Sequence, residues 1–238
     1  MGYKYVKGVK ENPKFGKLLA VNFNPYKVCS FNCVYCGIGP TTDKICERKL
    51  FYPPEDVFRE IRDYIERHGE PDYAWLTGLG EPTLYLGFKQ LSKMIKGLYP
   101  DIKIGVYSNG SLFFREDVRD DFSLSDLMLI NLNSVCPNEF SKICRHHKEV
   151  NLDEIINGIK LFRQQFGGVF GIVSIFLDGI NDNQKNLNGL KRLLLDIKPD
   201  FYVLKNYACR GYKALDGEFK KMAEDIFNDL PFETVYNF

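Results

Sequence analysis

The sequence contains no long apolar run and no excess of one charge. No stretch reaches the roughly 20 apolar residues that a membrane helix needs, and the first residues, MGYKYVKGVKENPKFGK, lack the apolar core of a signal peptide. The 32 basic and 31 acidic residues leave a formal net charge of +1, so no global attraction to polyanions is expected. These absences predict a soluble, cytoplasmic protein that does not act at a membrane.

Linkers, low-complexity tracts and changes of composition are also missing from the 238 residues. A chain of this length can bury one large core, so a single domain over residues 1–238 is expected, with its core at about 17–230. The seven cysteines are odd in number and unevenly clustered. This pattern favours reduced thiols and a metal site over a disulfide framework.

Stretches with an apolar period of two alternate along the chain with stretches of helical period, which is typical of repeated βα units. The first kind predicts strands at residues 18–24, 73–78, 103–109, 127–133, 169–177 and 200–207. The second kind predicts helices at residues 53–69, 88–99, 115–122, 152–166, 184–197 and 217–230. Parallel strands joined by right-handed helical crossovers then give an α/β fold, a partial (β/α)6 barrel of the TIM type.

Chemically suggestive residues follow each of these strands. In chain order they are Cys29, Cys33 and Cys36, then residues 77–82, 108–110, 133–134, 178–181 and 207–210. Ligands of such folds bind at the carboxyl ends of the parallel strands. All six groups are therefore expected at one rim of the barrel.

Cys29, Cys33 and Cys36 carry the strongest signal. A cubane iron-sulfur cluster normally takes four cysteines, so three would leave one iron open, and an open position distinguishes a catalytic metal site from a structural one. Cys46 keeps a second hypothesis open, because four cysteines could bind a structural zinc ion or a complete electron-transfer cluster in a non-catalytic module. Its neighbours Arg48 and Lys49 could equally position an anionic substrate.

The other rim residues each have an ordinary explanation. Gly78 and Gly80 suit a simple turn, Glu81 before a proline suits a solvated loop, and Ser108 and Asn109 precede a glycine in a sequence that also suits a turn.

Cys136, Cys144 and Cys209 are predicted in loops near the same rim. They could bind a second cluster or contact a substrate, although scattered cysteines are more often plain thiols. His146 and His147 could add ligands or a proton donor, or belong to an exposed basic loop. Arg210 could pair with a substrate carboxylate or phosphate, or be a surface arginine.

The spacing of the three cysteines after the first strand, with Tyr35 just before Cys36, resembles the signature of the radical S-adenosylmethionine (SAM) enzymes. TGLGEPTL at residues 77–84 resembles the Gly-Gly-Glu motif of that family, and YSNGSL at 107–112 resembles its ribose-side motif. PYKVCSFNCVYCGIGPTT, GEPTL, NGSL and GINDN are similar to a branch of iron-sulfur oxidoreductases related to the demethylwyosine synthases of tRNA.

This resemblance implies the roles of the rim residues. The three cysteines would hold a 4Fe-4S cluster whose open iron binds the amino and carboxylate groups of SAM. Gly80 and Glu81 would receive the methionine amino group, with Gly78 as a further cofactor-binding residue of the same motif, and Ser108 and Asn109 would face the ribose or the methionyl carboxylate. Tyr35 would lie against the adenine, with Asn133 as a weaker candidate contact to the same ligand.

The resemblance also implies a reaction. One electron, from an external donor of the flavodoxin or ferredoxin type, would cleave SAM to methionine and a 5′-deoxyadenosyl radical that abstracts a hydrogen from the substrate. Demethylwyosine synthases have an additional amino-terminal cysteine set and a strongly basic surface, whereas here no cysteine precedes Cys29. The substrate is therefore left unidentified, with an RNA base slightly favoured over a peptide or small metabolite.

Overall fold

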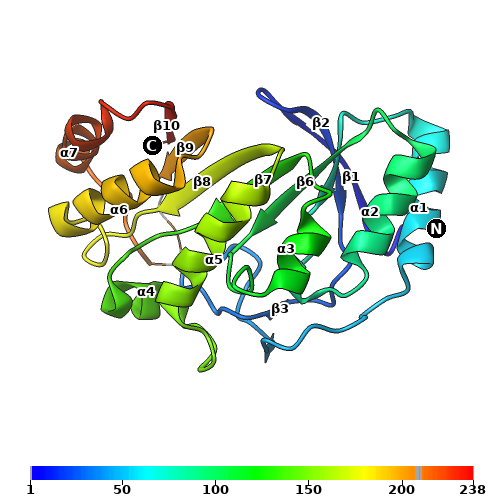
Figure 1. Cartoon of the computed structure of the whole chain (residues 1–238), viewed down its shortest axis with the longest axis horizontal. Coiled ribbons are helices and arrows are strands. Elements are labelled where there is room, and N and C mark those ends of the chain that lie inside the picture. The colour runs from blue at the N-terminus through cyan, green and yellow to red at the C-terminus, as the bar shows by residue number, and fades with distance from the viewer. Residues whose placement is uncertain (1, 207–208, 210, 238) are drawn as a thin grey trace.

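The computed structural model describes residues 2–206, 209 and 211–237, and its main element is one curved sheet with helices on the outer face (Figure 1). In spatial order the strands are β1 (Val6–Asn12), β2 (Gly16–Val21), β5 (Tyr73–Leu76), β6 (Lys103–Ser108), β7 (Leu127–Asn131), β8 (Val169–Ile175), β9 (Phe201–Lys205) and β10 (Glu233–Asn237). β1 is antiparallel to β2, and every other neighbouring pair is parallel. A separate two-residue ladder pairs β3 (Val28–Cys29) with β4 (Asp43–Lys44).

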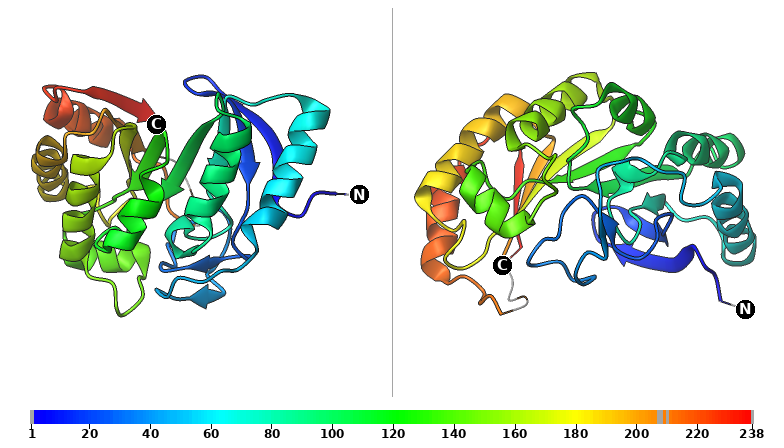
Figure 2. Two further views of the ribbon diagram at one scale, coloured as in Figure 1. Left: turned by 45° about the vertical axis from the view of Figure 1, so that its right-hand side comes forward. Right: turned by 90° about the horizontal axis from the view of Figure 1, so that it is seen from below.

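The helices lie between successive parallel strands. They are α1 (Pro54–His68), α2 (Phe88–Leu98), α3 (Glu116–Phe122), α4 (Pro137–Cys144), α5 (Leu152–Gln165), α6 (Gln184–Ile197) and α7 (Gly217–Phe227), with a short 3-10 turn, η1 (Pro82–Leu84). All of the α-helices except α4, which lies at one end of the barrel, cover the convex side of the sheet (Figure 2). No helix in the described part of the chain is both long and apolar enough to span a bilayer.

Helix α1 shows how sequence sets these boundaries. Pro54 starts the helix, where its missing N–H costs nothing, and acidic side chains fill the first turn. Val57, Ile61 and Ile65 form its buried stripe, and Gly69 ends it with a φ of 85° that favours glycine.

The predicted α/β partial barrel is confirmed, and the twelve predicted strands and helices all exist with boundaries shifted by a few residues. The sequence patterns missed β1, β10 and α4, and also the short elements β3, β4 and η1. Strand β10 makes the parallel part of the sheet seven strands wide, because residues 233–237 pair in register with 201–205.

The barrel is open on one side. Within the described residues, no backbone ladder joins β1 to β10. Lys14, in the turn between β1 and β2, instead forms an ion pair with Glu233 of β10. The ammonium group of Lys14 also lies 4.2 Å from the centre of the Phe201 ring.

Candidate functional site

Cys29 is the last residue of β3, and Cys33 and Cys36 lie in the connection from β3 to β4; residues 27–42 are called the cysteine loop. Cys29 is buried and Cys33 and Cys36 are half-buried. The Cys36 N–H donates to the Cys33 carbonyl at 3.2 Å, so the last two thiols lie on one turn. The loop is fixed to α4 because the N–H groups of Asn32 and Val34 donate to the last two carbonyls of that helix, at 2.9 Å each.

The loop after β5, which carries the predicted glycine motif, pairs with the start of the cysteine loop. The Lys27 N–H donates to the Leu79 carbonyl at 2.9 Å, and the Glu81 N–H donates to the Val28 carbonyl at 3.0 Å. A Cβ atom on Gly80 would stand 1.8 Å from the Val28 oxygen. Gly80 is therefore required for the two loops to approach each other.

Glu81 is buried and joins two of the predicted groups. Its Oε1 accepts hydrogen bonds from the Thr83 backbone, the Thr83 hydroxyl and the Ser108 hydroxyl, at 3.0, 2.7 and 2.6 Å. Its Oε2 accepts from the Asn109 N–H at 2.9 Å. Burial raises the pKa of Glu81, and these hydrogen bonds oppose that rise. The structure thus brings Glu81, Ser108 and Asn109 together.

Asn109 connects this group to the first cysteine. Its Nδ2 donates to the Ser30 hydroxyl at 2.9 Å and lies 3.7 Å from the Cys29 sulfur, which also accepts the Phe31 N–H at 3.5 Å. Burial, and then the charge of Glu81, raise the pKa of Cys29 to about 12. A thiolate at this position therefore needs a cation beside it, and a coordinated metal ion supplies one. The donor set fits a metal ligand.

Cys33 lies against Cys144. Cys144 is buried and its pKa is raised, chiefly by burial, so it remains a thiol and hydrogen-bonds to Cys33. That hydrogen bond is the main cause that lowers the pKa of Cys33. The prediction of a loop position for Cys144 is wrong, because Cys144 is the last residue of α4. Cys144 packs in the buried hydrophobic cluster behind the cysteine loop.

Tyr35 is held by an asparagine cluster at the end of β7. Its hydroxyl donates to Asn131 Oδ1 at 2.6 Å and accepts from Asn133 Nδ2 at 3.0 Å. Asn133 is almost fully buried and its Oδ1 accepts the Ile175 N–H at 2.8 Å. Asn133 thus orients Tyr35 and connects β7 to β8.

The remaining predicted cysteines, Cys136 and Cys209, are fixed by their own backbone contacts. Cys136 is the N-cap residue of α4 and donates its N–H to the Ser134 hydroxyl at 2.9 Å. Cys209 forms a backbone bridge with Tyr212. In the described ranges, Cys136, Cys144 and Cys209 do not gather as ligands of one ion. Arg210 lies outside the described residues.

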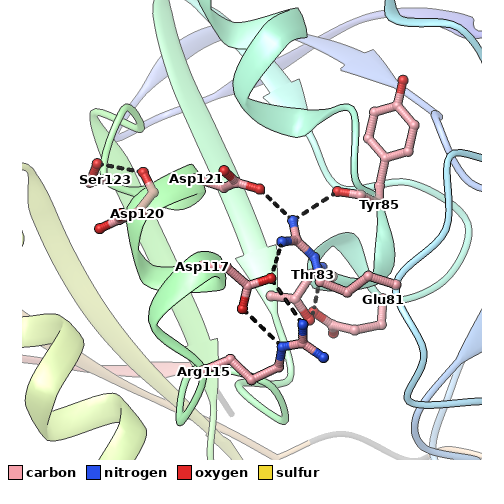
Figure 3. A network of polar contacts seen from close by, with 9 residues as sticks. Glu81, Thr83, Tyr85, Arg115, Asp117, Asp120, Asp121 and Ser123 are labelled. Carbon is pink, nitrogen blue, oxygen red and sulfur yellow. Dashed lines mark hydrogen bonds and ion pairs between the residues drawn. The ribbon is translucent and has the colours of Figure 1, made fainter.

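The proposed substrate role of Arg48 is wrong. Only 3% of its side chain is exposed, and its guanidinium binds Asp117 and Asp121 at 2.9 and 2.6 Å. It also donates to the carbonyls of Thr83 and Tyr85, at 3.0 and 3.2 Å. Figure 3 labels the four partners of Arg48, which are Thr83, Tyr85, Asp117 and Asp121. Arg48 therefore fixes the segment that carries Glu81.

Replacing Arg48 with methionine is expected to lower the free energy of unfolding by about 3 kcal/mol, because it leaves a largely buried carboxylate unpaired. The matched control is Arg115→Met, since Arg115 binds the same Asp117 but is 41% exposed. That change should cost less than about 1 kcal/mol. Urea unfolding followed by circular dichroism measures both, and equal losses would contradict the assignment.

Two polar residues of the site were missed in the sequence. Lys27 is buried, and its charge opposes the rise in the pKa of Cys29 and adds to the Cys144 hydrogen bond in lowering the pKa of Cys33. Asn24 donates through Nδ2 to the Glu81 carbonyl at 2.6 Å, and its buried Oδ1 has no hydrogen-bond partner among the described residues. The signal in the sequence was two polar residues flanking Pro25-Tyr26 between a buried strand and the first cysteine.

A cavity of about 410 Å³ lies on the concave face of the sheet. Several strands contribute to its wall, with Trp75 from β5, Tyr107 from β6 and Lys205 from β9. Gly78 and Gly80 of the glycine motif and Ile38 of the cysteine loop border the same space. Burial lowers the pKa of Lys205, whose ammonium lies 5.9 Å from the centre of the Tyr107 ring.

The model of the radical SAM superfamily matches residues 23–188 of this chain. A UPF0026 protein of Methanocaldococcus jannaschii is 33% identical over 189 residues, which cover 79% of this chain and 58% of that protein. A Brachyspira hyodysenteriae protein named GTPase Obg is 30% identical over 228 residues, which cover 94% of this chain and 33% of that protein. The chain thus spans less than two thirds of the length of either relative.

Two solved structures share the fold. A radical SAM methyltransferase from Sphaerobacter thermophilus matches with a TM-score of 0.70 and 15% identity, over 96% of this chain and 68% of that one. TYW1 with a lysine-pyruvate adduct bound matches with a TM-score of 0.64 and 21% identity, over 89% of this chain and 73% of that one. At these identities the likeness concerns the fold alone.

Proposed function

Because this chain belongs to the radical SAM superfamily, we propose that Cys29, Cys33 and Cys36 hold the 4Fe-4S cluster of that family. The chain is a radical SAM enzyme whose cofactors are this cluster and SAM. Three thiols on one loop leave the fourth iron for SAM. The buried Cys29, with the donors of Asn109 and Phe31 directed at its sulfur, supports this assignment.

We assign the SAM contacts to the group around Glu81. Each carboxylate oxygen can accept about two hydrogen bonds. Glu81 Oε2 accepts one, from the Asn109 N–H, and so has room for another. The carboxylate would accept the methionine amino group, and the unpartnered Oδ1 of Asn24 is a second acceptor beside Gly78. Tyr35 would offer its ring to the adenine, with Asn133 acting through Tyr35. Ser108 and Asn109 would fix Glu81 and face the ribose or carboxylate.

When bound, the cluster supplies the electron that divides SAM into methionine and a 5′-deoxyadenosyl radical. The chain's own residues then have two tasks. Gly78 and Gly80 place SAM at the border of the cavity, and the apolar side chains Ile38 and Leu129 exclude water from it.

The position of the cavity is the observation that carries the proposal. It is bordered by the cysteine loop, by the glycine motif and by the inner side of the sheet. A substrate in this space would lie next to the SAM that those two loops bind. Its volume of about 410 Å³ is within the usual range for a small-molecule site.

The cavity lining favours a planar substrate with an anionic group. Trp75 and Tyr107 offer ring faces for stacking, and none of the ion pairs among the described residues includes Lys205. We propose a nucleobase of RNA as the substrate, ahead of a peptide or a small metabolite, and a hydrogen atom of that base as the atom removed. The electron donor, which enzymes of this kind need, is proposed to be of the flavodoxin or ferredoxin type.

Reductive SAM cleavage tests the enzymatic assignment. The protein is reconstituted anaerobically with iron and sulfide, reduced with dithionite and given SAM. We expect 5′-deoxyadenosine, and none when dithionite is omitted. A stable reduced cluster that forms no 5′-deoxyadenosine, and whose electron paramagnetic resonance spectrum is unchanged by SAM, would overturn the proposal.

Lys205→Met is expected to weaken binding of a nucleoside monophosphate by about tenfold or more, because a charge-assisted hydrogen bond is lost. Trp75, the single tryptophan of the chain, lines the cavity, so its fluorescence reports the binding. Lys103→Met is the matched control, because Lys103 begins β6 and lies at the opposite end of the strands. Equal affinities in all three proteins, or quenching by peptides alone, would refute the nucleotide class.

A further inference from the structure

Cys46, His147 and Glu149 form a second group of metal-binding side chains, separate from the three-cysteine loop. One ligand atom from each lies within 4.8 Å of the ligand atoms of the other two. None of Cys29, Cys33 and Cys36 belongs to this group. Cys46 follows β4, and the other two residues lie in the connection between α4 and α5.

The backbone holds these three residues in place. The Ile45 N–H, next to Cys46, donates to the Cys29 carbonyl at 3.2 Å. The His147 N–H donates to the Ser30 carbonyl at 2.8 Å, and the His147 carbonyl accepts the Val150 N–H at 3.0 Å. The two segments are therefore already fixed to the cysteine loop at adjacent residues, so little conformational entropy is lost when an ion binds.

A thiolate, an imidazole and a carboxylate are the three protein ligands that zinc prefers. Around one tetrahedral zinc ion the ligand atoms are roughly 3.3–3.7 Å apart, given metal-ligand distances of about 2.0–2.3 Å. His147 Nδ1 and Glu149 Oε2 are 3.9 Å apart. The Glu149 side chain is 66% exposed and can turn to close this difference. His147 Nδ1 also accepts the Glu149 N–H at 3.3 Å, and this long hydrogen bond breaks when Nδ1 binds the ion. We propose that Cys46, His147 and Glu149 bind one zinc ion, with water in the fourth position.

The same three residue types could instead activate a cysteine nucleophile. Such a cysteine needs a depressed pKa, produced by a neighbouring cation or helix N-terminus. Here burial, and then the charge of Glu149, raise the pKa of Cys46 to about 11. The surroundings of Cys46 therefore do not activate it as a nucleophile.

An ion at this position would join segments that are about 100 residues apart in the chain. It would connect the segment after β4, which follows the cysteine loop, to the segment directly after α4, the helix whose Cys144 contacts Cys33. The zinc ion would thus stabilise the loop that carries the proposed cluster ligands, without touching the cluster. This role does not depend on the proposed substrate or on SAM cleavage.

Metal content tests the site. The full-length protein is reconstituted with its cluster, so that zinc cannot occupy the three cysteines, then incubated with zinc and desalted. Zinc and iron are measured by plasma mass spectrometry. Wild type should retain about one zinc per chain, and Cys46→Ser and His147→Ala should lose it with iron unchanged. Glu149→Gln, a mild surface change, should weaken zinc binding by more than the roughly 10- to 100-fold caused by loss of an outer ligand contact.

Cys136→Ser and His68→Ala are matched controls, because they remove the same residue types outside the group. Both should retain zinc. The proposal is overturned if wild type retains no zinc, or if all the variants retain it equally. Loss of iron from Cys46→Ser would overturn it in another way, by making Cys46 a cluster ligand. Rapid alkylation of Cys46 by iodoacetamide at neutral pH, undiminished by zinc, would favour the nucleophile.

Discussion

Cys33→Ala is expected to lose most of its iron, and its formation of 5′-deoxyadenosine should fall to background. The three thiols of the loop are proposed to bind three irons, so removal of one leaves an iron without a protein ligand. Iron and sulfide per chain, together with 5′-deoxyadenosine formed under dithionite, measure the effect.

Cys144→Ala is the matched control because Cys144 contacts Cys33 and is the same residue type, buried behind the loop. We expect this variant to keep its cluster and to cleave SAM, at a cost of about 1 kcal/mol in stability from the lost packing. If Cys33→Ala retained a full cluster and lost it only when Cys144 was also replaced, the ligand assignment would be wrong.

Gly80→Ala is expected to lower the free energy of unfolding by about 4 kcal/mol or more. Few single substitutions destabilise a protein this much. The added Cβ would stand 1.8 Å from the Val28 oxygen, which is backbone and cannot move aside as a side chain can. The two loops must separate, and Glu81 then loses the hydrogen bond from its N–H to that oxygen. SAM binding should weaken beyond detection in equilibrium dialysis.

Gly97→Ala is the control that tests whether the destabilisation expected for Gly80→Ala is specific to position 80. Gly97 is exposed in the last turn of α2, and a Cβ there meets nothing within 4 Å. Because alanine is the better helix former, this variant should be as stable as wild type or slightly more stable. Comparable destabilisation of the two variants would show that the close approach at Gly80 is not what requires glycine.

The sequence predicted the helices and strands that have a clear apolar pattern. It missed those whose apolar pattern is weak or too short to recognise. Helix α1 has a regular apolar period and strand β7 a continuous apolar run, so their existence was clear. Residues 233–237 are exposed or half-buried along their whole length, so no alternation identified β10. Its pairing depends on β9, a contact that period alone cannot predict. Helix α4 has only eight residues, which is two turns and too short for a clear period.

The same limit applies to the site. The spacing of Cys29, Cys33 and Cys36 identified the family, because chemistry constrains these residues directly. Glu81 was identified by its motif, but its bonds to Ser108 and Asn109 required the structure. Arg48 was misinterpreted because an arginine beside a cysteine loop gives no local sign of burial. Its partners Asp117 and Asp121 lie about 70 residues away.

The ion pair between Lys14 and Glu233 has a consequence for the width of the barrel. A backbone ladder would hold the two sides of the sheet at a fixed separation, whereas here a contact between side chains that are 38% and 57% exposed holds them. Salt screens such a pair, so its strength falls as ionic strength rises. The distance between the β1–β2 turn and β10 can thus change without the loss of any strand pairing. The open side of the barrel can therefore widen around a ligand that is larger than the cavity.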